Sequence, residues 1–167
     1  MNFSSNRWVL LHHQVGDRLV DRGDRLVDRG DHFDFMLAPA GSLQEVTGSE
    51  DSRSEDSRCL WTWAIPVNPL DQSLPLECSA DRLPNHRAAY LEYEGPVSGD
   101  RGNVQRVANG SYQVVSWSEK RIELLVTCSN TIVTGHDGPF SVLLTRQGES
   151  YHLSWSATPL QTRHASD

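Results

Sequence analysis

The chain has 167 residues, a net charge of −7 and a mean hydropathy of −0.50, which fits one polar domain with a sizeable core. An isoelectric point near 5.4 argues against a tight, extended grip on a nucleic-acid duplex, but it does not exclude a small pocket for one strand end. No apolar run approaches the roughly 20 residues of a membrane helix, and the N-terminal residues lack the apolar centre of a signal peptide. We expect a cytoplasmic monomer without a membrane partner, whose three cysteines are reduced.

Short runs rich in aromatic and β-branched residues follow one another along the chain. They predict about eight strands, at residues 7–13, 32–37, 60–65, 88–94, 112–117, 121–127, 140–145 and 151–155. Turn sequences such as Asn109-Gly110 and Gln147-Gly148 separate them. We therefore predict an all-β fold, a compact closed or nearly closed β-barrel with little helix. One domain spans residues 1–160, and residues 161–167 form a flexible tail.

Two perfect tandem duplications lie in the first third of the chain. The sequence DRLVDRG fills residues 17–23 and again 24–30, and SEDSR fills residues 49–53 and again 54–58. Two copies are too few for a solenoid, which needs at least three stacked units. Because tolerated insertions lie in surface loops, residues 14–31 and 47–58 are predicted to be long loop insertions outside the core.

The sequence HFDF at residues 32–35 has a pattern that can bind a metal. Side chains two apart on a strand share a face, so His32 and Asp34 lie side by side while the two phenylalanines pack behind them. A neutral imidazole and a carboxylate together can bind a divalent metal such as Mn²⁺ or Zn²⁺. The pair His12-His13 ends the strand-like run upstream and offers a further ligand.

A second informative segment surrounds His86. This histidine follows a proline turn and precedes a run predicted as a strand, which places it at the mouth of a strand. Tyr90 is four positions further on, so a short turn or bulge lets both side chains reach one site.

The order of these segments resembles the 3′-phosphoesterase domain found at the N-terminus of bacterial DNA ligase D, which also occurs as a free-standing protein. The family pattern is a strand ending in His, then H-[YFW]-D-[FL]-x-L, S/T-W-A-[VI]-P, D-H-x-x-x-Y-x-x-[FY]-E-G, and a glycine-rich turn before a strand that ends in Trp. The corresponding stretches are His12-His13, HFDFML at residues 32–37, TWAIP at 62–66, NHRAAYLEYEG at 85–95, SGDRGN at 98–103 and YQVVSW at 112–117. The match runs from about Arg7 to Trp155, and its ordered motifs make it specific.

The resemblance implies a compact barrel with a crater that holds one divalent metal, typically Mn²⁺, with Zn²⁺ or Co²⁺ as alternatives. The family's metal ligands carry over to His32, Asp34 and one of His12 or His13. Counting along the strand from Arg7 favours His13, whereas the family's loop length, counted back from His32, favours His12. We favour His13, because strand register slips less easily than loop length changes.

The family's catalytic residues carry over to His86 and Tyr90. The implied reaction is hydrolysis at a nucleic-acid 3′ end, which releases a 3′ phosphate or a 3′-terminal ribonucleotide in DNA repair. The metal polarises phosphoryl oxygens, His86 stabilises the transferring group or donates a proton to the leaving oxygen, and Tyr90 orients the phosphate. The implied partners are primer–template DNA ends and ligase or polymerase repair proteins.

Two departures from the family pattern weaken the implied activity. Met36 and Val67 stand where the family has an arginine and a lysine that face the phosphate. Each lost cation removes charge-assisted hydrogen bonds worth roughly 1.5–3 kcal/mol. Arg82, Arg87 or Arg101 can supply phosphate-binding charge from neighbouring loops. The alternative is an inactive relative that binds metal and either nucleic-acid ends or a repair partner, and a third hypothesis is a barrel without metal.

Overall fold

The computed structural model describes residues 6–15, 30–39, 58–129 and 139–158, most of which lie in strands. The strands are β1 (Asn6–Gln14), β2 (His32–Ala38), β3 (Arg58–Ile65), β4 (Leu76–Arg87), β5 (Gly95–Pro96), β6 (Asn103–Trp117), β7 (Arg121–Cys128), β8 (Phe140–Gln147) and β9 (Ser150–Ala157). A short 3₁₀ helix, η2 (Ala88–Leu91), follows β4.

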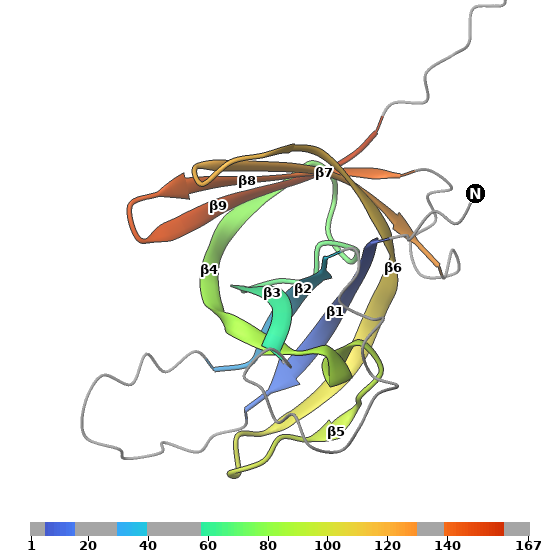
Figure 1. Cartoon of the computed structure of the whole chain (residues 1–167), viewed down its shortest axis with the longest axis vertical. Coiled ribbons are helices and arrows are strands. Elements are labelled where there is room, and N and C mark those ends of the chain that lie inside the picture. Colours follow the sequence, from blue (N-terminus) through green and yellow to red (C-terminus); the bar gives the residue numbers. More distant parts are fainter. Residues whose placement is uncertain (1–5, 16–29, 40–57, 130–138, 159–167) are drawn as a thin grey trace, which may run out of the picture.

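The strands form a closed antiparallel β-barrel (Figure 1). Their order round the ring is β1-β2-β3-β4-β9-β8-β7-β6, and the pairing of β1 with β6 closes it. The two-residue strand β5 pairs with the start of β6. The predicted all-β barrel of about eight strands is confirmed, since eight strands make up the ring.

Strand alternation sends neighbouring side chains of β1 to two different cores. Trp8 and Leu10 belong to a buried cluster with members from all eight strands of the ring, so this cluster fills the barrel interior. Val9 and Leu11 belong to a smaller cluster, which joins the outer face of β1–β3 to Leu91 of η2. The middle of β1 is therefore buried on both faces.

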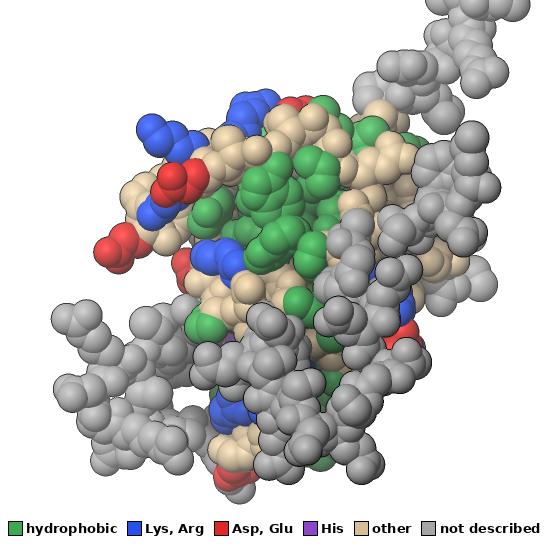
Figure 2. All heavy atoms as spheres, viewed as in Figure 1, with side chains coloured by type: hydrophobic (Ala, Val, Ile, Leu, Met, Phe, Trp, Pro, Cys, Tyr) green, Lys and Arg blue, Asp and Glu red, His purple; other side chains and the backbone are tan. Residues whose placement is uncertain are grey.

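The barrel interior is rich in aromatic rings. Figure 2 shows hydrophobic side chains inside the ring of strands and charged side chains toward its outer edge. Trp155 packs against Trp8, Phe35 and Phe140, with ring centroids 6.0, 5.6 and 5.9 Å away. Such tilted or edge-to-face pairs contribute about 0.5–1.5 kcal/mol each beyond burial. The indole of Trp8 also donates a hydrogen bond to the Thr127 carbonyl oxygen at 3.1 Å, which ties β1 to β7.

The strand predicted at residues 88–94 is wrong. Residues 88–91 form η2, and the strand lies before them as β4, which pairs with both β3 and β9. Much of β4 is half-buried or exposed, so polar residues obscure its alternation in the sequence. His86 consequently lies at the end of a strand rather than before one.

The turn predicted at Asn109-Gly110 is also wrong, because both residues lie inside the 15-residue strand β6. A Cβ on Gly110 would lie 1.8 Å from the Thr127 carbonyl oxygen. Glycine is needed here for close approach of the backbones and not for a turn. The turn predicted at Gln147-Gly148 is found between β8 and β9, where Gly148 has a φ of +66°.

Most of the predicted loop insertions, residues 14–31 and 47–58, and the whole predicted tail, residues 161–167, lie outside the described residues. The described ends of these insertions include Gln14, which belongs to β1, and Arg58, which belongs to β3. The predicted insertions are therefore too wide at these two points. In the part of the chain that the structure describes, no helix is long and apolar enough to span a bilayer.

Candidate metal centre and pocket

The pairing of β1 with β2 brings two histidines and one aspartate together. His13 lies directly opposite His32, and Asp34 follows two residues later on β2. All three side chains share the outer face of these strands, above the smaller hydrophobic cluster. His12 faces the other way and stacks on Phe33, with ring centroids 4.6 Å apart. The structure therefore brings His13, and not His12, to the predicted ligand pair.

The three side chains are close enough to surround one ion. Asp34 Oδ2 lies 3.4 Å from His13 Nδ1, and Asp34 Oδ1 lies 3.2 Å from His32 Nε2. One possible ligand atom from each residue lies within 4.8 Å of the other two. Such distances suit atoms arranged round a common ion at bond lengths of about 2 Å. The Asp34 side chain is only 3% exposed, so the group is shielded from water.

A backbone carbonyl holds the outer nitrogen of each imidazole. His13 Nε2 lies 2.7 Å from the Arg101 carbonyl oxygen, and His32 Nδ1 lies 2.9 Å from the Gly30 carbonyl oxygen. A carbonyl oxygen only accepts, so these nitrogens donate, and in a neutral ring the inner nitrogen then carries a lone pair. Both inner nitrogens face Asp34, whose buried Oδ1 has no hydrogen-bond partner among the described residues. A metal ion between the three side chains, or a proton on one imidazole ring, would bind both to Asp34 and to an inner nitrogen.

Asp34 is ionised at neutral pH. Burial raises the pKa of this carboxyl, but the close interactions with His13 and His32 outweigh burial and lower the pKa to about 2. A buried carboxylate needs a positive charge beside it. Two imidazoles and a carboxylate are ligands for first-row divalent metals, so the three residues fit the metal that the sequence suggests.

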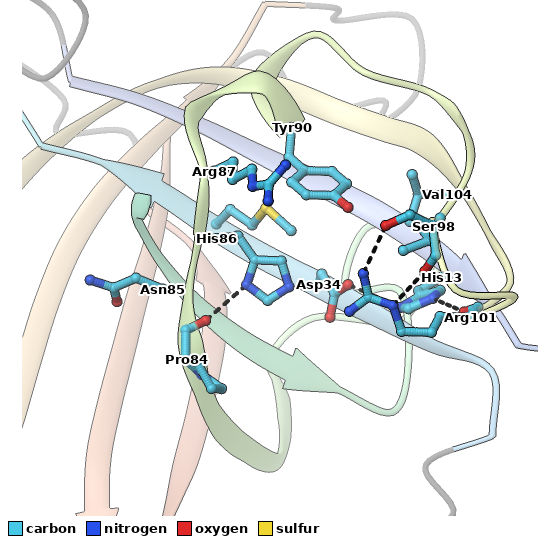
Figure 3. Close-up of a pocket in the computed structure, with 12 residues that line it drawn as sticks. His13, Asp34, Pro84, Asn85, His86, Arg87, Tyr90, Ser98, Arg101 and Val104 are labelled. Atoms are coloured by element: carbon cyan, nitrogen blue, oxygen red, sulfur yellow. Dashed lines mark hydrogen bonds and ion pairs between the residues drawn. The ribbon is translucent and has the colours of Figure 1, made fainter. Parts of the chain in front are cut away.

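Two members of this candidate metal-ligand group, His13 and Asp34, form one wall of a pocket of about 290 Å³ (Figure 3). The lining comes from β1, β2, the end of β4, η2, the segment between β5 and β6, and the start of β6. It comprises His13, Asp34, Met36, Pro84, Asn85, His86, Arg87, Tyr90, Val97, Ser98, Arg101 and Val104. In Figure 3 the His86 ring points toward Asp34 from the other side of the pocket. Tyr90 packs edge-on against His86, with ring centroids 5.7 Å apart. The predicted catalytic pair thus shares one pocket with the predicted ligands His13 and Asp34, and His32 lies beside Asp34 outside the lining.

A bulge in β4 aims His86 at this pocket. Thr62 pairs with Leu83 and Leu60 pairs with His86, so β4 has one more residue than β3 across this step. His86 Nδ1 donates to the Pro84 carbonyl oxygen at 2.9 Å, which leaves Nε2 on the pocket side. Burial lowers the pKa of His86 below its usual value of 6.5, so the ring is neutral at neutral pH.

Two of the three predicted phosphate-binding arginines line the pocket. Arg87 follows His86 at the end of β4, and Arg101 lies between β5 and β6. The Arg101 guanidinium donates through Nε to the Ser98 carbonyl oxygen at 2.7 Å and through Nη2 to Ser98 Oγ at 3.2 Å. These bonds hold the guanidinium in front of Asp34 in Figure 3.

The third predicted arginine, Arg82, does not line this pocket. Its guanidinium carbon lies 5.0 Å from the centroid of the Trp63 ring, which belongs to the barrel interior. The guanidinium also donates to the Thr62 carbonyl oxygen at 3.2 Å and to Asn85 Oδ1 at 2.6 Å. Proximity in sequence to His86 is misleading, because the bulge turns the two side chains to different faces of β4.

The two departures from the family pattern occupy different surroundings. Met36 follows Asp34 by two residues and lines the pocket, so an apolar side chain stands beside the metal-ligand group. Val67 is not among the lining residues. Of the two positions, only Met36 therefore lies in this pocket.

Three further residues line the pocket without having been predicted from the sequence, namely Val97, Ser98 and Val104. The contact of His13 with the Arg101 carbonyl oxygen was not predicted either. The sequence SGDRG signalled a tight turn, but not its neighbour in the fold. The turn lies next to the end of β1 because β6 pairs with both β5 and β1, and this pairing has no local signal in the sequence.

No protein-family model matches this chain, and no curated protein matches it. The structure itself defines the class of site. The protein is a closed antiparallel β-barrel that carries a candidate metal centre of two histidines and one aspartate. Next to this centre lies a pocket that is lined by a further histidine and two arginines.

Proposed function

We propose that this protein is a divalent-metal-dependent phosphoesterase of the DNA ligase D 3′-phosphoesterase kind, acting on nucleic-acid 3′ ends in DNA repair. The observation that carries the proposal is the group of His13, His32 and Asp34, two of which, His13 and Asp34, line a pocket whose opposite side is lined by His86. The proposed substrates are a 3′ phosphate and a 3′-terminal ribonucleotide on a primer–template.

Mn²⁺ is the ion that we propose for the centre, with Zn²⁺ or Co²⁺ as alternatives. His13 Nδ1, His32 Nε2 and an oxygen of Asp34 would hold it. When bound, such an ion polarises a phosphoryl oxygen and offsets the charge that develops during hydrolysis. The buried Asp34 oxygen without a hydrogen-bond partner supports this fit.

Arg87 and Arg101 make the pocket suitable for a phosphate group. A guanidinium binds phosphate oxygens through two parallel hydrogen bonds. The volume of about 290 Å³ lies at the small end of ligand pockets, which hold about 300–1,000 Å³. This size supports entry of a terminal phosphate with part of one nucleotide, and the net charge of −7 agrees with weak contact to the rest of a duplex.

His86 is suited to proton transfer in this pocket. Its Nδ1 is committed to the Pro84 carbonyl oxygen, so the neutral ring offers Nε2 as a proton acceptor. A water molecule between His86 and a bound phosphate can lose its proton to this nitrogen as it attacks. The leaving oxygen, on the far side of the phosphorus atom, takes its proton from solvent, and the charged ring returns its proton to solvent. Tyr90 holds the ring edge-on and has a hydroxyl that can orient a phosphate oxygen.

The test is phosphate release from a 3′-phosphate primer–template and nucleoside release from a 3′-ribonucleotide primer–template, each with Mn²⁺ and with EDTA. Wild type should act only with Mn²⁺. His86→Gln should slow release by about 100-fold or more, the usual effect of removing a general acid or base. His32→Ala should slow release at the same Mn²⁺ concentration because it removes one of the three proposed metal ligands. His12→Ala is the matched control, because this histidine faces the barrel interior, and it should keep the wild-type rate. Equal rates for wild type and His32→Ala would contradict the proposal.

Met36 favours a second candidate function. An apolar side chain stands in the pocket where the family has a positive charge, which favours an inactive relative that binds metal and a nucleic-acid end or a repair ligase or polymerase. This alternative predicts that Mn²⁺ raises Tm and that a 3′-phosphate oligonucleotide binds without turnover. Turnover that is restored by Met36→Arg would support descent from an active enzyme, whereas turnover by the wild type excludes the alternative.

A further inference from the structure

The loop from Ser98 to Gly102 joins β5 to β6 and contacts the end of β1. We infer that this loop positions the metal ligand His13. The Arg101 carbonyl sets which ring nitrogen of His13 faces Asp34, and Gly102 sets where that carbonyl lies. This role presupposes the proposed metal centre and adds a positioning element to it.

The two histidines present opposite ring nitrogens to Asp34. His32 presents Nε2 and His13 presents Nδ1, at 3.2 and 3.4 Å from the carboxylate. A neutral imidazole can carry its proton on either nitrogen, so a partner must select one. His32 finds that partner at Gly30, two residues away, whereas His13 finds it at Arg101, 88 residues away. The orientation of His13 therefore depends on a distant segment of the chain.

The loop can reach His13 because Gly102 has no side chain. A Cβ on Gly102 would lie 2.1 Å from the carbonyl oxygen of Gln14, the residue that follows His13. The backbone φ of Gly102 is +99°, in the region that favours glycine. Any larger residue at this position must push the loop, and with it the Arg101 carbonyl, away from β1.

Internal hydrogen bonds hold the loop in shape. The Val97 N–H donates to the Gly102 carbonyl oxygen at 2.8 Å. The Arg101 guanidinium binds both the carbonyl oxygen and the hydroxyl of Ser98. These hydrogen bonds join the two ends of the loop to each other. Because they do not involve an ion, the protein alone places the Arg101 carbonyl oxygen next to His13.

The expected effect follows from the behaviour of ligating histidines. Partners that hold the outer nitrogen of such a histidine typically contribute about 10- to 100-fold to metal affinity. Moving the Arg101 carbonyl should therefore weaken Mn²⁺ binding by that factor, although all three ligands are retained.

The test compares Gly102→Ala with Gly99→Ala in the full chain. Gly99 also has a positive φ, +76°, but a Cβ there meets only Arg101 Nε, at 3.8 Å. Both variants carry backbone strain, and only Gly102→Ala collides with β1. Electron paramagnetic resonance of free Mn²⁺ gives the affinity. Imidazole ¹⁵N shifts of the metal-free protein, at a pH where the rings are neutral, show which nitrogen carries the proton.

Wild type and Gly99→Ala should show His13 protonated at Nε2 and His32 protonated at Nδ1. Gly102→Ala should lose the preference at His13 only, with Mn²⁺ affinity reduced about 10- to 100-fold. His13 protonated at Nδ1 in the wild type would overturn the inference whether or not Gly102→Ala folds. Wild-type affinity in a folded Gly102→Ala would overturn it as well. Absence of Mn²⁺ binding to the wild type would instead count against the proposed function, and the ¹⁵N spectrum would still decide the role of the loop.

Discussion

Replacing His12 and His13 one at a time separates the metal centre from the barrel. The two residues are neighbours on β1 and face opposite sides of it. His13 faces Asp34, and His12 stacks on Phe33. His13→Ala removes one of three ligands, whereas His12→Ala removes only an aromatic contact worth about 0.5–1.5 kcal/mol.

The expected change in Tm follows from the free energy with which a bound ion stabilises the folded state. An ion present at 100 times its Kd stabilises the folded state by about 2.7 kcal/mol. For a chain of 167 residues, about 1 kcal/mol moves Tm by roughly 2–4 °C, so Mn²⁺ should raise the wild-type Tm by roughly 5–10 °C. Loss of a ligand should raise Kd by about 100-fold or more, since outer partners alone contribute about 10- to 100-fold. His13→Ala then gains only about 0.4 kcal/mol, or roughly 1–2 °C.

The assay is thermal unfolding of EDTA-treated protein with and without Mn²⁺. His12→Ala should unfold at a lower temperature than wild type in EDTA, yet keep the full Mn²⁺-induced rise. His13→Ala should lose most of that rise. The reasoning is refuted if Mn²⁺ stabilises His13→Ala as much as wild type, or if His12→Ala is the variant that loses the response.

Three further predictions concern the barrel and the pocket. Gly110→Ala should lower the free energy of unfolding by about 1–3 kcal/mol, because the new Cβ would lie 1.8 Å from the Thr127 carbonyl oxygen; an unchanged urea midpoint would contradict this. Glu92→Gln should cost less than about 1 kcal/mol in the same assay despite the ion pair with Arg7, since the Glu92 side chain is 67% exposed. Burial lowers the pKa of His86 below 6.5, so the folded chain binds this proton less readily than the unfolded chain. The stability associated with the neutral ring is complete above about pH 6.5 and is lost as the pH falls toward the folded-state pKa. Relative to His86→Asn, wild type should therefore lose stability between about pH 7 and pH 5, and a constant difference would argue against a buried ring.

Alternation along β1 and β2 could be predicted from the sequence. The order histidine, aromatic, aspartate, aromatic in HFDF places the ligands on one face, and the structure has this arrangement. The choice between His12 and His13 needed strand register, which depends on the pairing of β1 with β2. Loop length, the competing criterion, changes without moving a strand, which explains why it favoured His12, the histidine that faces away from Asp34.

Contacts between distant backbones could not be predicted. Gly110 and Gly102 both mark such contacts, one with Thr127 and the other with Gln14. A glycine in a sequence signals a need for space or for an unusual φ, but not which of the two, nor the partner. The bulge that aims His86 at the pocket could not be predicted for the same reason. It is defined by the register between β3 and β4, and therefore by a contact between two separate strands.

The double-sided burial of β1 and β2 has an evolutionary consequence. Each residue of these strands serves either the barrel interior or the outer face with the metal-ligand group, and its neighbours serve the opposite side. Deletion of a single residue within β1 would turn every residue on one side of the deletion to the opposite face of the strand. A substitution in β1 or β2 therefore disturbs one side of the sheet, whereas a change in length disturbs both. Along the sequence, both tandem copies, DRLVDRG and SEDSR, begin after one strand has ended and before the next strand starts.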